Sequence, residues 1–215
     1  LAGKTAIELV AGYQTSMNTF QHLTQAGVET MDLFREAAIK LGADPILPGQ
    51  SMKDAAEAMM RLAQGGLSAT DAIDAARGAL ALAVIGMVPA NIAAAGMADA
   101  LKMFKLPGTE AMHVADLFAN VMQRTGATFH EVTEAFRVAG PTFAAAKVPI
   151  EELATLTAIL ANNGIRGADA GQKLREMVQS LVEPGEAAQG ALGKLQTHVY
   201  NLDGSMRPLP EIFAD

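Results

Sequence analysis

Cysteine and tryptophan are absent from this chain of 215 residues, and only 5% of the residues are aromatic. Without cysteine the chain can form no disulfide, no thiol nucleophile and no cysteine-ligated zinc site. The shortage of aromatic side chains disfavours β-sheet, which is enriched in aromatic and β-branched residues. Half of the residues are hydrophobic all the same, and twelve of them are methionines. This composition predicts helices that pack closely through small side chains.

Charge is scarce as well. Charged residues make up 18% of the chain, against about a quarter in typical domains, and the net charge is −7 with a pI near 5.1. Binding to nucleic-acid phosphates needs a surplus of lysine and arginine, so we expect no direct nucleic-acid binding. A surface with little charge fits an alanine-rich bundle or a surface partly covered by partner proteins, and the composition leaves both open.

The ends of the chain carry no familiar targeting signal. The first residues, LAGKTAIELVAGYQ, lack an initiator methionine and the basic-then-apolar pattern of a secretory signal. The last residues, RPLPEIFAD, stop without a helix-capping element. We therefore expect the chain to be part of a longer protein.

Helical periodicity dominates the sequence. Apolar residues spaced three or four apart over residues 4–41 predict one long helix or two, with a bend at Gly27, and two prolines and a glycine predict a loop at 43–50. Capping residues, Thr109 among them, and Gly or Pro stops predict further helices. These cover 51–64, 68–86, 91–105, 109–124, 128–140 (ending at Gly140-Pro141), 151–163, 167–182 and 186–195. We expect an irregular segment from residue 198, with a turn or hairpin tip at 201–205.

An internal repeat runs through these helices. RLAQGGLSATDA (61–72) aligns without gaps with ILANNGIRGADA (159–170), and a weaker copy surrounds Gly126. Each copy consists of a helix, a glycine that ends it, a small capping residue and a new helix. Any helix–turn–helix uses the same kinds of residue, so the similarity need not reflect a true repeat. Either origin predicts an all-α fold of stacked helical hairpins, an irregular helical bundle.

The order of these blocks resembles the core region of the phage tail tape-measure family. The resemblance rests on residues 62–83, on VADLFANVMQRTGATFHEVTEAFRVAGP (114–141), on 147–178 and on LDGSMRPLPEIF (202–213). Its most specific element is Gly-Ile-x-Gly-Ala-x-Ala-Gly-x-x-Leu-Arg at 164–175. Lys147 departs from the family, which often has glycine there, as do Gln172 and Lys173. The motif residues are Gly66, Asp71, Gly126, Gly140, Pro141, Gly164, Gly167, Ala170, Gly171, Leu174, Arg175 and Gly204.

The resemblance implies a structural, non-enzymatic component of the virion tail. Proteins of this family are long and helical, fill the tail tube during assembly, set its length and leave ahead of the DNA. The implied partners are other copies of the protein, tail tube and tail-tip or baseplate proteins, and tail assembly chaperones. The implied location is the tail lumen or tip, after assembly in the host cytoplasm. Within the chain we expect a helix or helix pair at 1–42, a helical core domain at 51–195 and an irregular segment at 196–215.

Residues 78–98 suggest an alternative. GALALAVIGMVPANIAAAGMA carries no charge over a membrane-spanning length. A membrane-active segment that helps genome DNA cross the host envelope is therefore a second hypothesis, with the host membrane as a partner. Gly86, Pro89 and Asn91 interrupt the stretch, and alanine drives membrane insertion weakly. A buried helix–turn–helix is the favoured interpretation.

Catalytic and metal-binding patterns are weak, so we predict no catalytic residue, metal or cofactor. His22, His113, His130 and His198 lack ligand spacing; His113 and Asp116, one turn apart, fit a solvated helix face better than a metal site. Glu151 and Glu152 fit the start of a helix better than a glycosidase pair, because adjacent side chains point apart. For Gly164–Arg175 we favour close helix contact over a recognition surface, with Arg175 paired to a carboxylate of a neighbouring helix. The methionines fit core filling better than an adaptable binding surface.

Overall fold

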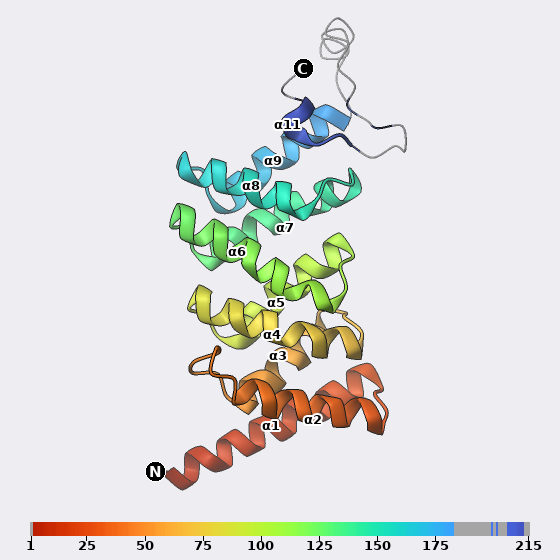
Figure 1. Cartoon of the computed structure of the whole chain (residues 1–215), viewed down its shortest axis with the longest axis vertical. Helices are drawn as coiled ribbons and strands as arrows, with labels where there is room; N and C mark the ends of the chain where they lie inside the picture. The colour runs from red at the N-terminus through yellow and green to blue at the C-terminus, as the bar shows by residue number, and fades with distance from the viewer. Residues whose placement is uncertain (1, 183–198, 200, 202–205, 213–215) are drawn as a thin grey trace, which may run out of the picture. The chain divides into compact units, whose positions relative to one another are not determined.

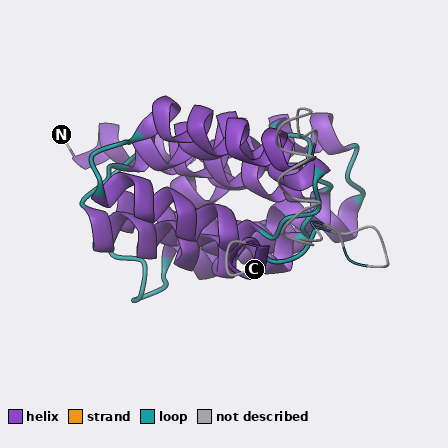
Figure 2. Ribbon diagram, turned by 90° about the horizontal axis from the view of Figure 1, so that it is seen from above, coloured by secondary structure: helices purple, strands orange, loops and turns teal. Residues whose placement is uncertain are grey.

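The computed structural model describes residues 2–182, 199, 201 and 206–212, and this part of the chain contains helices and no β-strand (Figures 1 and 2). The all-α prediction is confirmed. The helices are α1 (Ala2–Thr24), α2 (Val28–Gly42), α3 (Met52–Gln64), α4 (Ala69–Gly86), α5 (Ala90–Phe104), the 3₁₀ helix η1 (Gly108–Glu110), α6 (Ala111–Thr125), α7 (Phe129–Ala145), α8 (Ile150–Asn162), α9 (Gly167–Val182) and α11 (Leu209–Ile212).

The chain divides into two compact units, Leu1–Ala119 and Asn120–Asp215. In the first unit α3 is central and packs against α1, α2, α4 and α5. Its helices run back and forth, so that the α1–α2, α3–α4 and α5–η1 turns share one edge and the 43–50 loop and the α4–α5 turn share the other (Figure 1). In the second unit α7 packs along α9, and α8 contacts both. The domain boundaries inferred from the sequence, at 42 and 195, remain a prediction.

Alanine fills the core of the first unit. Nine alanines of α3, α4 and α5 are completely buried, namely Ala55, Ala56, Ala58, Ala72, Ala75, Ala76, Ala79, Ala93 and Ala94. The helices consequently approach one another closely. A Cβ atom on Gly78 would lie 2.5 Å from the carbonyl carbon of Ala111, so only glycine fits there. Larger side chains such as Met59, Leu80 and Met97 fill the remaining space.

The predicted helical segment 4–41 forms two helices rather than one. The break lies at Gln25–Gly27, where Gln25 has a left-handed φ of 51° and Gly27 precedes the first turn of α2. Phe20 of α1 and Phe34 of α2 are both fully buried, with ring centroids 4.7 Å apart. Such an aromatic pair contributes about 1 kcal/mol beyond its burial. The two phenylalanines therefore hold the α1–α2 pair together.

The prediction that a helix ends at Gly140-Pro141 is wrong, because α7 continues to Ala145 with Pro141 inside it. An interior proline removes one hydrogen bond and costs about 3 kcal/mol. Phe143, in the turn after the proline, is completely buried, and burying such a side chain contributes about 2–3 kcal/mol. This burial offsets most of the cost of the proline.

Two other predictions differ from the structure, and two calls fall outside the residues that it describes. Thr109 does not cap α6; it lies inside η1, because Gly108 is held by a contact to Asp71 described below. The segment 196–215, predicted to be irregular, contains the four-residue helix α11. The helix predicted at 186–195 lies outside the described residues, as does Gly204.

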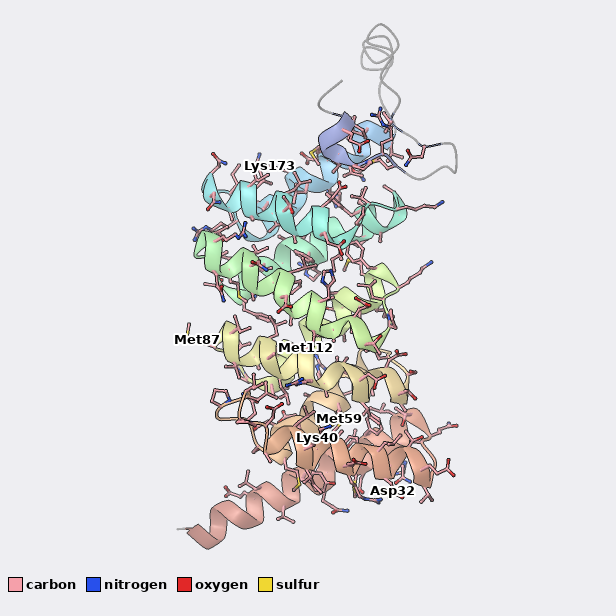
Figure 3. All side chains as sticks on the ribbon, viewed as in Figure 1. Asp32, Lys40, Met59, Met87, Met112 and Lys173 are labelled. Atoms are coloured by element: carbon pink, nitrogen blue, oxygen red, sulfur yellow. The ribbon has the colours of Figure 1, made fainter. Side chains whose placement is uncertain are left out.

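The methionines divide between core and surface. Met59 and Met97 are completely buried, as the core-filling interpretation predicts. Met87, in the α4–α5 turn, is 91% exposed, and Met112 is exposed as well (Figure 3). Core filling therefore explains only some of the methionines.

Candidate functional site: the glycine turns

Three turns share the backbone of the repeated motif. Gly66, Gly126 and Gly164 have left-handed φ angles of +94°, +66° and +82° and follow helices α3, α6 and α8. A left-handed residue at this place ends a helix and is nearly free of strain only in glycine. The next helix begins three residues later in each copy.

The helix starts after the first two turns are capped in the same way. Ser68 accepts a hydrogen bond from the backbone of Asp71, and Thr128 accepts one from the backbone of Glu131. The Glu131 carboxylate in turn accepts from the Thr128 N–H at 2.7 Å, which completes a capping box. Both acids lie in the first helical turn, where the helix dipole favours negative charge.

Asp71 also joins two turns of the first unit. Its Oδ1 accepts a hydrogen bond of 2.8 Å from the backbone N–H of Gly108, at the start of η1. A Cβ atom on Gly108 would lie 2.2 Å from the carbonyl oxygen of Asp71, so the contact requires glycine. Nearby, Lys102 donates from Nζ to the carbonyl oxygen of Gly65 at 3.2 Å, at the carboxyl end of α3. The α3–α4 turn is thus bound to the α5–η1 turn.

Arg166 joins two turns of the second unit. It occupies the position that Ser68 and Thr128 hold in the other copies, and its guanidinium reaches back to the ends of two helices. Nη2 donates to the carbonyl oxygen of Thr125 at 2.8 Å, and Nε donates to that of Ala161 at 3.5 Å. Helix carboxyl ends carry partial negative charge and unpaired carbonyls, which a guanidinium satisfies well. The α6–α7 turn is thereby tied to the α8–α9 turn.

Helices α7 and α9 approach through the most specific part of the motif. Gly171 faces Ala135 and Val138 of α7, and a Cβ atom on it would lie 2.7 Å from Ala135 O and from Val138 Cβ. Ala170 and Leu174, on the same side of α9, are buried. Gly167, the first residue of α9, has a φ of +59°. These observations favour close packing as the role of this element.

Arg175 behaves differently from the prediction that paired it with a carboxylate on a neighbouring helix. Its Nη2 donates to Oε1 of Gln172, on the same helix, at 3.2 Å. Its Nε is buried and has no hydrogen-bond partner among the described residues. Arg77, its counterpart in the repeat, does bind a carboxylate, that of Asp44 at 3.2 Å.

The residues considered for catalysis or metal binding form no site within the described part of the chain, and His198 lies outside that part. The described residues hold no group of three or more His, Asp or Glu side chains that could bind a metal ion, and His113 and Asp116 are exposed. Glu152 has a structural contact that the sequence did not indicate, since its Oε2 accepts from the backbone N–H of Leu209 at 3.1 Å. This bond holds α11 against the first turn of α8.

The uncharged stretch 78–98 forms the end of α4, the turn at Met87–Pro89 and the first part of α5. No single helix of the described chain is long and apolar enough to cross a membrane, whereas α4 and α5 pass that test together, with a bend of 120° between them. The inner faces of both helices are buried. The predicted helix–turn–helix is present and its inner faces are buried, whereas its turn is exposed at Met87.

Comparison with known proteins shows the family to which the chain belongs. Residues 35–215 match the family described as phage-related minor tail protein. The chain belongs to this family. Proteins similar to it include the tape measure protein of Pneumococcus phage Dp-1, 31% identical over the whole chain, and the probable tape measure protein of Escherichia phage P2, 30% identical over 96% of the chain. The chain spans only 18% and 26% of these relatives' lengths. No solved structure matches it.

The glycines of the motif should respond to substitution in two distinct ways. Gly164 has open space around its Cβ position and a left-handed φ, so Gly164→Ala should cost about 1 kcal/mol of stability and Gly164→Asn less, because asparagine tolerates this backbone. Gly171 is helical and crowded, so Gly171→Asn should cost more than Gly171→Ala, about 2–3 kcal/mol. Urea unfolding followed by circular dichroism measures both series. The same order of alanine and asparagine at both positions would contradict this assignment.

The turn carboxylates should make stability depend on pH. The Gly108 N–H, with the Ser68 hydroxyl, lowers the pKa of Asp71 below its ordinary 3.8, and the Thr128 backbone N–H, its hydroxyl and the Arg166 charge lower the pKa of Glu131 below 4.5. A lowered folded-state pKa stabilises the fold above the unfolded value, and the contribution is lost as pH falls through the folded value. Urea midpoints should therefore fall below about pH 4.5. Asp71→Asn and Glu131→Gln should flatten this dependence, and an unchanged slope in both would refute it.

Proposed function

We propose that the chain is a compact docking or plug segment of a tape-measure protein, acting by protein–protein packing during tail assembly. The observation that carries the proposal is the match over 35–215, together with tape measure proteins that align over nearly the whole chain. The proposed role is structural and non-enzymatic. The longer protein would set tail length and leave the tail during DNA ejection.

The stacked hairpins support a docking role over a ruler role for this segment. A continuous helix of forty residues is about 60 Å long, because it rises about 1.5 Å per residue. Neighbouring packed helices lie about 8–10 Å apart, so a hairpin of the same length adds about 20 Å or less along its stack. A stack of hairpins therefore spans much less length per residue than a continuous helix does. Length would be set by other parts of the longer protein.

The proposed partners follow from this role. They are other copies of the protein and tail assembly chaperones before assembly, and tube and tail-tip or baseplate proteins afterward, in the tail lumen or tip. Exposed apolar side chains provide a surface to which such partners can bind. In the first unit Val28, Ile39, Ile46 and Met87 are each at least 60% exposed, and exposed apolar groups of this kind mark interaction surfaces when they cluster.

Deleting residues 51–182 in frame should leave phage heads normal and tails absent, aberrant or non-infectious, because the docking hairpins would be lost. Electron microscopy of the lysate together with plaque counts measures this, and a full-length copy supplied in trans is the control. Shortened but infectious tails would show that the region contributes only length. Normal tails with full infectivity would refute the proposed class of function.

A membrane role remains the second candidate, on a specific observation. The charge-free stretch 78–98, at the α4–α5 turn, presents an apolar tip, since Ile85, Met87 and Ile92 are exposed. Because the inner faces of these helices are buried in the unit, we expect the chain to stay free of liposomes in a flotation assay at neutral pH. The opposite result would be flotation with vesicles that Met87→Asp abolishes and the control Met112→Asp retains. That result would favour membrane insertion of the tip over docking to proteins.

A further inference from the structure

Helix α2 has an outer face that nothing in its unit covers. Its inner face buries Met31, Phe34, Ala38 and Leu41. On the outer face Val28 is 76% and Ile39 is 60% exposed, and the side chains of Asp32 and Arg35 are 63% and 46% exposed. Figure 3 shows Asp32 pointing away from the rest of the unit. These four residues, Val28, Asp32, Arg35 and Ile39, form what we call the α2 stripe.

The spacing of the α2 stripe is that of a helix–helix seam. Its members follow one another at intervals of four, three and four residues, which places them within a sector of about 60° on a helix of 3.6 residues per turn. Alternating steps of three and four are the a and d positions of a two-stranded coiled coil. The stripe is therefore shaped to receive another helix.

The order of residues in the stripe specifies that helix. The stripe reads apolar, acid, base, apolar, so it is complementary to its own reverse. When two α2 helices lie antiparallel about a two-fold axis near Leu33 and Phe34, Val28 faces Ile39 of the second copy and Asp32 faces Arg35. Antiparallel coiled coils pair a with d positions in this manner, and a two-fold interface must be self-complementary. A parallel pairing would instead place Asp32 against Asp32 and Arg35 against Arg35.

We propose that two copies of the chain associate through antiparallel α2 helices, with the α2 stripe as the contact. This names a surface for the self-association in the proposed function and rests on that function only for its role in assembly. The apolar ends supply most of the binding free energy. The exposed charge pairs contribute less than about 1 kcal/mol each and chiefly fix the orientation. One helix from each copy buries less than the roughly 800 Å² per partner of a standard interface. The dimer is accordingly weak, with a Kd on the order of 10–100 µM.

Charge reversal tests the pairing directly. Asp32→Arg places four arginines at the centre of the dimer and Arg35→Asp places four aspartates there, so each variant alone should associate at least about tenfold more weakly than the parent chain. An equimolar mixture of the two restores every opposite-charge pair and should associate again. Sedimentation equilibrium over a concentration series measures this, with circular dichroism to verify folding. The matched control is the Glu134–Arg137 pair of α7, whose side chains are 27% and 60% exposed, and its reversal should leave self-association unchanged.

Each result of this experiment decides the proposal. A parent chain that stays monomeric up to about millimolar concentration overturns it, since the expected Kd is far lower. Association that is unaffected by either single reversal shows that another surface is used. A mixture that fails to associate when both variants are folded rules out the antiparallel arrangement.

Cross-linking provides a second measurement that does not depend on charge. The chain has no cysteine, so Val28→Cys and Ile39→Cys introduce single thiols on an exposed face. Under mild oxidation the two variants should form a disulfide with each other when mixed and little when alone. In the antiparallel dimer two copies of residue 28 are about 16 Å apart along the helices, beyond the 7 Å reach of a disulfide. Efficient dimers of Val28→Cys alone would overturn the proposal. Because α2 precedes residue 51, this outcome is independent of the deletion phenotype.

Discussion

Close approach of helix backbones through alanine and glycine is the constraint on which the structure depends. A buried alanine removes little apolar surface from water, so a helix with an alanine face gains stability only when it touches neighbours along much of its length. Gly78 against Ala111 and Gly171 against Ala135 show how near these backbones come. A single hairpin of this kind buries too little to be stable alone. It needs the next hairpin beside it, and α3 accordingly packs on four helices.

The turns follow from the same constraint. Helices that lie close together must be joined by short connections, and short connections after a helix need a left-handed residue. Glycine supplies it at 66, 126 and 164, whereas Met87, Lys105 and Lys147 adopt it at some cost in strain. Short turns also leave helix carbonyls close to neighbouring turns. Lys102 and Arg166 use these carbonyls as acceptors, so the edges of each unit are joined by polar bonds while the interior is joined by packing.

Local features of the fold could be predicted from the sequence, whereas contacts between distant residues could not. Helix starts could be predicted from capping boxes, because a capping box involves only four consecutive residues. The two examples are Ser51 with Asp54 and Thr128 with Glu131. The continuation of α7 through Pro141 could not be predicted, because the burial of Phe143, which offsets most of the cost of the proline, depends on tertiary packing. The sequence contains one indication of the contact made by Arg166, which is a long cationic side chain at a position where the other copies have serine or threonine. Its acceptor, Thr125, lies 41 residues away and cannot be identified by pattern alone.

The exposed outer face of α2 shows another limit of sequence reasoning. Val28 continues the apolar period of Met31 and Phe34, yet at 100° per residue it lies about 60° from Met31 and about 120° from Phe34. It therefore stands at the edge of the buried face and is exposed. Periodicity counts apolar residues but does not tell which of them the protein's own core covers. The positions of α1, α3 and α4 separate the inner residues from the outer ones.

The left-handed turn residues have a consequence for how such chains change over evolution. Gln25, Gly66, Lys105 and Lys147 recur about every forty residues, and Met87, Gly126 and Gly164 do so as well. Helices in stacks of this type contact mainly their neighbours, so a whole hairpin is the smallest piece that can be gained or lost while every remaining helix keeps its contacts. Long insertions and deletions in related chains should therefore have lengths that are multiples of about forty residues. Shorter ones should be confined to the turns.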